Sequence, residues 1–322
     1  MKERIVLAYT GSLQTSMAIR TLAEADDAEV VTLTLDLGQG RDLEEIRDRA
    51  LATGAARAHV LDAREEFAHE FVLPALHAGA LHEVRQTMGA ALALPLIARK
   101  LLEMAVIERS TAIAHGCTGA DRNRMDASVR TLEPDVRVIA AARTAVAERN
   151  HANLLGRVHA TTRPLAEAPD TPAHVGIAFE RGMPAAINGV PMPLTELIES
   201  LAIIAGRHGV GRTEKKDDSG VPGTERRLIY EAPAAVVLHA AHTALEASVM
   251  PRDLLRLKRE KATEYARIVS DGLWFTAARR TLDACNAKVQ ERVTGSVRVT
   301  LFKETLLAAE AGELAPAGGT HR

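Results

Sequence analysis

The feature that most constrains the fold is an alternation of short apolar runs and amphipathic segments at the N-terminus. Residues 4–9 (RIVLAY) and 29–35 are short, apolar and rich in β-branched side chains, as buried strands are. Residues 13–25 carry apolar side chains at helical spacing, residues 42–53 form a second helical pattern, and residues 59–62 resemble a third strand. Units of this kind need right-handed crossovers, so the sequence predicts a parallel sheet covered by helices.

The pattern continues with two helical and two extended segments. These are residues 65–82, 90–109, 111–115 and 136–139. Parallel sheets of this kind bind ligands at the carboxyl ends of their strands, where the strand order reverses. The loops after residues 9, 35 and 115 are therefore the predicted ligand-binding positions.

The character of the chain changes after about residue 144. Residues 161–174 are rich in Pro and polar residues and suggest a linker, and residues 175–179 alternate like an edge strand. Asn188-Gly189 predicts a tight hairpin. Later helical patterns and a late strand are predicted at residues 194–206, 234–248, 252–270 and 297–302. We expect domains at 1–160 and 174–308, followed by a disordered tail at 309–322.

Composition excludes several classes of protein. The net charge is −2 and aromatic content is 3%, which argues against nucleic-acid binding through stacked bases. No apolar run reaches the roughly 18 residues of a spanning helix, and the N-terminus lacks a signal-peptide pattern, so we expect a cytoplasmic protein without a membrane partner. Cys117 and Cys285 lie far apart, so neither a disulfide framework nor a metal site is predicted.

The strongest candidate site is the segment from Ala8 to Ser16 (AYTGSLQTS), which combines a strand end, a tight turn and a helix start. Backbone N–H groups at a helix start attract anions, and the hydroxyls of Thr15 and Ser16 add donors. From these residues alone, phosphate binding and an ordinary capped helix start both remain open. His115 ends a predicted strand, where the pattern favours a structural histidine over a catalytic base.

The Ala8–Ser16 segment resembles the pyrophosphate loop of argininosuccinate synthases, A-Y-S-G-G-L-D-T-S. Further landmarks of that family follow in order along nearly the whole chain: Asp36–Gly40, Asp62–Phe67, Ala114–Gly119, His208–Arg212, Tyr230–Pro233, Asp271–Phe275 and Gln290–Gly295. The resemblance implies an α/β fold. Its first part would be a parallel-sheet nucleotide-binding domain of the adenine nucleotide alpha hydrolase (PP-loop/HUP) type, followed by a second, α+β synthetase domain.

The resemblance also implies an AMP-forming carbon–nitrogen ligase of arginine biosynthesis. Such enzymes use ATP and Mg²⁺ to adenylate the ureido oxygen of citrulline, and the aspartate amine then displaces AMP. The implied partners are small amino-acid substrates and further copies of the chain in a homo-oligomer. The implied ATP-binding residues are Ala8, Tyr9, Thr10, Gly11, Ser12, Thr15, Ser16, Leu35 and Gly116. The implied aspartate-binding residues are Thr118 and Asp121, and the implied contacts to a citrulline-like acceptor are Gln86, Arg124, Asp218 and Tyr230.

The chain departs from the family pattern at several of these positions. Ser12 replaces a second glycine, Gln14 replaces an aspartate, and Gln86 replaces a tyrosine. Ala90 and Ala91 stand where the pattern has hydroxyl side chains. Two hypotheses follow. The chain is a ligase acting on citrulline or a related ureido acceptor, or it is a catalytically inactive or repurposed paralogue that acts as a binding or assembly protein. For Arg122 and Arg124 the residues alone leave a solvated basic loop as the alternative to a carboxylate site.

Overall fold

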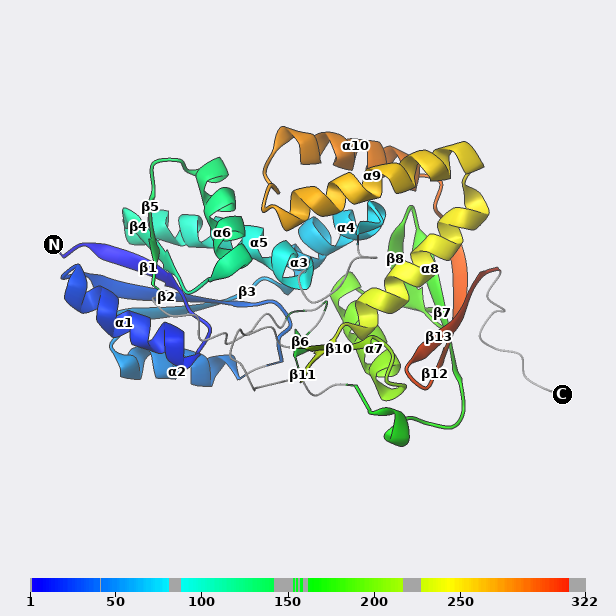
Figure 1. The fold of residues 1–322 in the computed structure, drawn as a ribbon, viewed down its shortest axis with the longest axis horizontal. Helices are drawn as coiled ribbons and strands as arrows, with labels where there is room; N and C mark the ends of the chain where they lie inside the picture. Colours follow the sequence, from blue (N-terminus) through cyan, green and yellow to red (C-terminus); the bar gives the residue numbers. More distant parts are fainter. Residues whose placement is uncertain are drawn as a thin grey trace. The chain divides into compact units, whose positions relative to one another are not determined.

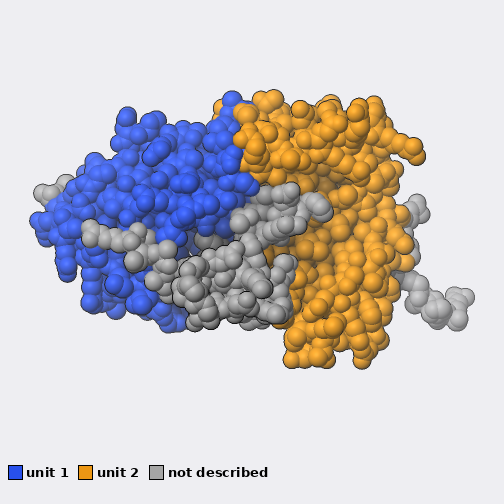
Figure 2. Space-filling view, viewed as in Figure 1, with its two compact units in different colours: residues 1–67, 90–153, 268–277 blue, residues 68–89, 154–267, 278–322 orange. Residues whose placement is uncertain are grey.

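The protein is described here by a computed structural model, which describes residues 2–40, 42–80, 88–141, 153, 155, 157–158, 162–216 and 227–312. The chain divides into two compact units, each built from separated stretches of sequence (Figure 2). Unit 1 comprises residues 1–67, 90–153 and 268–277, and unit 2 comprises residues 68–89, 154–267 and 278–322. The linear division into 1–160 and 174–308 stays a prediction.

Unit 1 contains the predicted parallel sheet. Its five strands are ordered β3-β2-β1-β4-β5, and every neighbouring pair is parallel (Figure 1). The strands are β1 (Arg4–Ala8), β2 (Glu29–Asp36), β3 (Arg57–Asp62), β4 (Ala112–His115) and β5 (Arg137–Ala140). Strands β2 and β3 follow one another on one side of β1, and β4 and β5 lie on the other side of β1. The order therefore reverses between β1 and β4, where ligands are expected.

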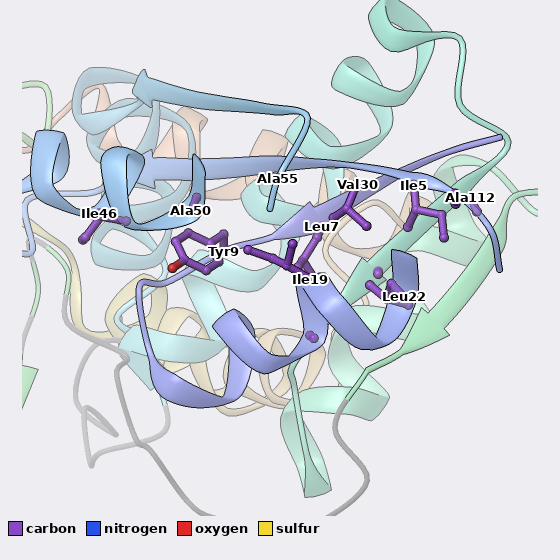
Figure 3. Close-up of a cluster of buried hydrophobic side chains, with 13 residues drawn as sticks. Ile5, Leu7, Tyr9, Ile19, Leu22, Val30, Ile46, Ala50, Ala55 and Ala112 are labelled. Carbon is purple, nitrogen blue, oxygen red and sulfur yellow. The ribbon is translucent and has the colours of Figure 1, made fainter. Parts of the chain in front are cut away.

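Helices α1 (Leu13–Ala25) and α2 (Leu43–Thr53) pack together over this sheet. Asp42 caps α2 by accepting from the Glu45 amide, and Gly54 ends it at φ 111°. Buried side chains of both helices join those of three strands in one core (Figure 3): Ile19, Leu22, Ile46, Ala50, Ile5, Leu7, Val30 and Ala112. Each large aliphatic group in such a core contributes about 1.5–3 kcal/mol of burial free energy.

Two further helices belong largely to unit 1, and one of them was not predicted. Helix α5 spans Met88–Glu108, close to the expected pattern. Helix α6 spans Gly119–Leu132, where the sequence suggested a substrate loop. Its hydrophobic pattern is sparse, since only Met125 and Val129 are large buried apolar residues, so helical periodicity gave little signal.

The prediction of one continuous helix at residues 65–82 is wrong for residues 65–80, and residues 81–82 lie outside the described residues. Residues Arg64–Phe67 form α3, Ala68–Val72 form a π-helical turn, and Leu73–His77 form α4. Pro74 has no amide hydrogen to donate back to residue 70, which accounts for the irregular turn before it. The boundary between units 1 and 2 falls at this irregularity.

Unit 2 contains a five-stranded antiparallel sheet ordered β13-β12-β7-β8-β9 (Figure 1). Its strands are β7 (Ala173–Glu180), β8 (Met183–Ile187), β9 (Val190–Pro191), β12 (Gly295–Phe302) and β13 (Thr305–Ala311). The turn of the predicted hairpin is present, with Asn188 at φ 50° and Gly189 at φ 79°. The edge-strand prediction for residues 175–179 is wrong, because β7 is central and pairs with β12 from far along the chain.

Strand β13 corrects the predicted start of the C-terminal tail. Residues 309–311 pair with β12 instead of being disordered, after a turn in which Lys303 and Glu304 both have positive φ. Neither Lys nor Glu is a residue type that usually forms turns at positive φ. The sequence therefore carries no turn signal for this hairpin. Residues 313–322 of the predicted tail lie outside the described residues.

The remaining elements of unit 2 are mainly helical. They are a 3₁₀ turn (Leu165–Glu167), α7 (Leu194–Arg207), α8 (Pro233–Val249), α9 (Arg252–Ser270), α10 (Ala277–Gln290), and a small sheet of β10 (Arg212–Lys216), β11 (Arg227–Glu231) and β6 (Arg157–Val158). The end of α9 and the start of α10 belong to unit 1. Among the helices of the described ranges, none has both the length and the apolar character needed to cross a bilayer.

Candidate functional site

The β1–α1 loop has the geometry of a tight strand-to-helix turn. Gly11 adopts φ 74°, and a Cβ at this position would lie 2.9 Å from Cγ1 of Ile46. Ser12 caps α1, and its Oγ accepts from the Thr15 amide at 3.2 Å. Gly11 is therefore required both by its backbone angle and by the close approach of α2.

The hydroxyl groups of this loop bond to one another. Thr15 Oγ1 lies 3.1 Å from Ser12 Oγ and 3.3 Å from Thr10 Oγ1, and the hydroxyls of Tyr9 and Ser16 are 2.8 Å apart. A phosphate can replace such neutral bonds at small cost, because each contributes only about 1 kcal/mol net. The loop is thus an ordered set of donors at the start of a 13-residue helix.

Two other elements hold this loop in place. Arg49 of α2 donates from Nη1 to the Gly11 carbonyl at 2.8 Å and also pairs with Glu45. Gly116, which follows β4, lies against the start of α1, since a Cβ there would be 3.3 Å from Cγ2 of Thr15. The structure therefore places Gly116 beside Thr15, while the ATP contacts implied for both residues stay a prediction.

A cleft opens beside the loop, at the carboxyl ends of β1 and β2. With its open mouth included, the empty space of this cleft is about 760 Å³. Four predicted ATP-binding residues line it: Ala8, Tyr9, Thr10 and Leu35. The other five, Gly11, Ser12, Thr15, Ser16 and Gly116, are not among its lining residues and form the adjoining loop described above.

Sequence reasoning missed most of the lining. The additional residues are Leu33, Thr34, Leu37, Gln39, Ile46, Ala90, Ala93, Leu94, Ile97 and Asn153. Gln39 was signalled by its place just after β2, where it folds the loop by donating to the Leu35 carbonyl and accepting from the Leu37 amide, both at 2.7 Å. Of the α5 residues, Ala90 was signalled as a departure from the family pattern. Ala93, Leu94 and Ile97 gave no signal, because only the tertiary fold brings that helix to the strand ends. The largely aliphatic walls suit a flat, apolar-faced ligand such as a nucleobase.

The predicted aspartate site lies at the start of α6. Thr118 is the N-cap residue, yet its side chain makes no capping bond. Asp121 forms an ion pair with Nη1 of Arg124 at 2.5 Å. The Thr118 hydroxyl is therefore available to a ligand, beside an arranged pair of charges.

Arg124 is buried and holds two parts of unit 1 together. Its Nε donates to the carbonyl of Ser270, the last residue of α9, at 2.6 Å. A Cβ on Gly272 would lie 2.6 Å from the Arg124 Cα, so this contact needs glycine. The solvated-loop alternative is wrong for Arg124, although its contact with an acceptor substrate stays a prediction.

His115 is fully buried and positions the loop before α6. Its Nδ1 accepts from the Cys117 amide at 3.2 Å, so the neutral ring carries its proton on Nε2, which faces Asp126 Oδ1 at 3.2 Å. Burial lowers the pKa of the imidazole. This geometry supports the structural reading of His115.

Tyr230 belongs to unit 2 and lies on β11. Its side chain is buried, its hydroxyl has no hydrogen-bond partner among the described residues, and burial raises the pKa of Tyr230 to about 12. A buried hydroxyl without a partner costs about 1–3 kcal/mol, which a polar ligand would recover. Two other predicted acceptor contacts, Gln86 and Asp218, lie outside the described residues.

Comparison with known proteins decides the family. The model of the arginosuccinate synthase N-terminal HUP domain matches residues 4–159, and that of the arginosuccinate synthase C-terminal domain matches residues 138–311. The chain belongs to the argininosuccinate synthase family. An argininosuccinate synthase of Symbiobacterium thermophilum is 41% identical over 94% of this chain and 86% of its own length. That of Rubrobacter xylanophilus is 40% identical over 98% and 86%, respectively.

Membership of the argininosuccinate synthase family confirms the predicted fold class. The structure then shows what replaces the family's aspartate in the β1–α1 loop. Gln14 lies in the first turn of α1, and its Nε2 is buried without a partner in the described part of the chain. An amide there supplies a donor where the family pattern has a carboxylate. Within the described ranges, no group of three or more His, Cys, Asp and Glu side chains could hold a metal ion by itself.

Proposed function

We propose that this chain is an ATP-dependent ligase that joins aspartate to citrulline or a closely related ureido acceptor. The observation that carries the proposal is the aliphatic cleft at the ends of β1 and β2, directly beside the ordered donors of the β1–α1 loop. A nucleotide needs this pairing of an apolar surface for its base and N–H and O–H donors for its phosphates.

The reaction follows from the poor reactivity of a urea. The ureido oxygen attacks the α-phosphorus of ATP and pyrophosphate leaves. The aspartate nitrogen then attacks the activated ureido carbon, a C–N bond forms, and the C–O bond breaks as AMP leaves with the former ureido oxygen. The main task of the protein is to hold three substrates in reactive proximity.

Residue roles follow from position. Tyr9 and Leu35 flank the base, while Gly11, Ser12, Thr15 and Ser16 receive the phosphates at the start of α1. Mg²⁺ enters as the complex of the triphosphate, since this ion is usually bound through phosphates and one or two carboxylates. Gly116 leaves room for the nucleotide beside Thr15.

The departures at Ser12 and Gln14 are compatible with nucleotide binding. The Ser12 side chain turns inward to cap α1 and accepts from the Thr15 amide. Gln14 brings an amide donor with an unfilled hydrogen bond. Gln14 in place of an aspartate makes the loop less negative than the family pattern, whereas Ser12 in place of a glycine leaves its charge unchanged. Phosphate attraction is therefore retained, while direct metal coordination by residue 14 is weakened.

The amino-acid substrates would be held by the remaining predicted residues. Thr118 and Asp121 would bind aspartate, and the acceptor would contact Arg124, Tyr230, Gln86 and Asp218. The orphaned hydroxyl of Tyr230 is the contact that the structure supports best. We further propose that the enzyme acts in the cytoplasm as a homo-oligomer.

The test is the release of AMP and pyrophosphate from ATP with Mg²⁺, citrulline and aspartate. The proposal expects both products in equal amounts, and no AMP when either amino acid is omitted at steady state. Nucleotide binding without AMP formation, for citrulline and for other ureido acceptors, would support the non-catalytic alternative instead.

A further inference from the structure

Unit 2 contains a second pocket, between α8 and α9, that the ligase reaction does not use. We call it the α8–α9 pocket. It encloses about 910 Å³ including its mouth and is lined by Gly79, Ala80, His239, Thr243, Glu246, Leu255, Lys258, Arg259, Ala262, Thr263 and Ala266. Alanine and glycine line much of it, so the two helices leave space that larger side chains would fill.

One wall of this pocket carries a buried ammonium group. Lys258 is buried, and its Nζ lies 2.8 and 2.9 Å from the two carboxylate oxygens of Glu246. An ammonium has three N–H donors, so one is left over after both oxygens are bonded. Gly79 lies beside this ammonium and has no side chain, whereas a Cβ at this position would contact Nζ at 3.5 Å.

The charges of the wall favour an anion with a single negative charge. Glu246 is neutralised by Lys258 and also accepts from Gln290 Nε2 at 2.7 Å. Arg259 supplies a further positive charge, and in the described structure it forms no ion pair. One carboxylate balances Arg259, whereas a dianion such as hydrogen phosphate would bring a second negative charge that this wall does not balance.

The rest of the lining fits a short organic chain. Leu255, Ala262 and Ala266 provide an apolar surface, and Thr243 and Thr263 add two hydroxyl side chains to the lining. We propose that the α8–α9 pocket binds a small organic carboxylate, with its charged group at Lys258 and Arg259 and its aliphatic part against the two alanines.

Calorimetric titration with sodium butanoate at constant ionic strength tests this site. Saturable binding is expected for butanoate, and no binding for butylammonium, which has a similar chain and the opposite charge. Phosphate should bind at least about tenfold more weakly than butanoate. Equal binding of phosphate, or no butanoate heat at all, would overturn the proposal.

Matched variants locate the site. R259Q should weaken butanoate binding about tenfold, whereas R256Q, on an arginine of the same helix that does not line the pocket and pairs with Glu260, should not. A262L should abolish binding by filling the space. Because A262L can perturb packing, a second variant is needed. K258M/E246Q removes the ammonium without leaving an unpaired charge, and it should also abolish binding. Unchanged affinity in folded R259Q and K258M/E246Q would show that butanoate binds elsewhere.

Discussion

The polar groups of the β1–α1 loop are hydroxyls and backbone amides that lie beside a cleft. Unit 2, by contrast, contains charged and titratable groups that are buried. The groups of unit 2 form one cluster, consisting of His77, His242, Glu246, Lys258 and Gln290, which we call the buried polar cluster. His242 Nε2 bonds to Gln290 Oε1 at 3.0 Å, and the rings of His77 and His242 stack at 6.0 Å.

The polar groups of the loop and those of the buried polar cluster have different roles. Neutral bonds in the loop exchange cheaply for bonds to a ligand, as the proposed nucleotide binding requires. Charges in the buried polar cluster are costly to separate, so the cluster fixes the packing of α8, α9 and α10. We therefore expect substitutions in the cluster to change stability with little effect on ATP affinity, and substitutions in the loop to do the reverse.

The largest effect should come from removing the cation of the buried polar cluster. K258M leaves the buried Glu246 carboxylate without its charge partner, which typically costs about 3–5 kcal/mol of unfolding free energy. Urea denaturation followed by circular dichroism measures the loss. K258M/E246Q should recover a large part of it; a double variant no more stable than K258M would contradict the role assigned to this pair.

Acid should weaken unit 2 through its two stacked histidines. Burial lowers the pKa of His77 to about 4 and that of His242 to about 3, against an ordinary value near 6.5, and Lys258 nearby disfavours their protonation. The unfolded chain thus binds protons first, so stability is complete above about pH 6.5 and falls as the pH drops toward 4. At pH 5 the expected loss is about 2 kcal/mol per histidine.

Urea denaturation at pH 7.5 and pH 5 checks this dependence. H77Q should reduce the difference between the two pH values, because one titrating ring is removed while Glu246 and Lys258 remain. The same pH difference in H77Q and in the unsubstituted chain would show that His77 is not a source of the acid sensitivity.

Substitutions in the β1–α1 loop should change the affinity for ATP. G11A places a Cβ 2.9 Å from Ile46 at a φ of 74°, and we expect it to weaken ATP binding at least about tenfold, equivalent to about 1.4 kcal/mol. G54A is the matched control, since Gly54 also has positive φ but no atom within 4 Å of a Cβ. Titration calorimetry measures both affinities, and equal values for G11A and G54A would refute the steric argument.

The smallest effect is expected from restoring the family pattern in the loop. S12G frees the Thr15 amide from its cap, and Q14D returns a carboxylate to the first turn of α1. We expect S12G/Q14D to bind Mg²⁺·ATP a few-fold more tightly and metal-free ATP no better. Calorimetry with and without Mg²⁺ separates these outcomes, and tighter binding of both forms would contradict the role given to residue 14.

The sequence predicted unit 1 well because its signals are local. Each of the strands β1 to β4 is followed within a few residues by a helix. The buried apolar face of α1 is Ala18, Ile19 and Leu22, although Leu13 and Met17 of the same apolar pattern are exposed. The prediction that the loops after β1 and β2 bind a ligand follows from the same order. By contrast, β7 pairs with β12 more than a hundred residues away, and nothing in residues 175–179 reveals this partner.

The site was predictable only in part for the same reason. Ala8, Tyr9, Thr10 and Leu35 follow from strand ends, whereas the α5 wall of the cleft and the burial of Arg124 under residues 268–277 depend on the tertiary fold. The inward turn of the Ser12 side chain likewise needed atomic positions, because the sequence alone allowed it to block the phosphate.

The most direct test of the account follows the ureido oxygen. Citrulline labelled with ¹⁸O in its ureido group is incubated with ATP, Mg²⁺ and aspartate, and the AMP is analysed by mass spectrometry. Each AMP formed should carry one ¹⁸O atom. Unlabelled AMP, or unlabelled ADP together with ¹⁸O-labelled phosphate, would show that the cleft beside β1 does not deliver adenylate to this oxygen.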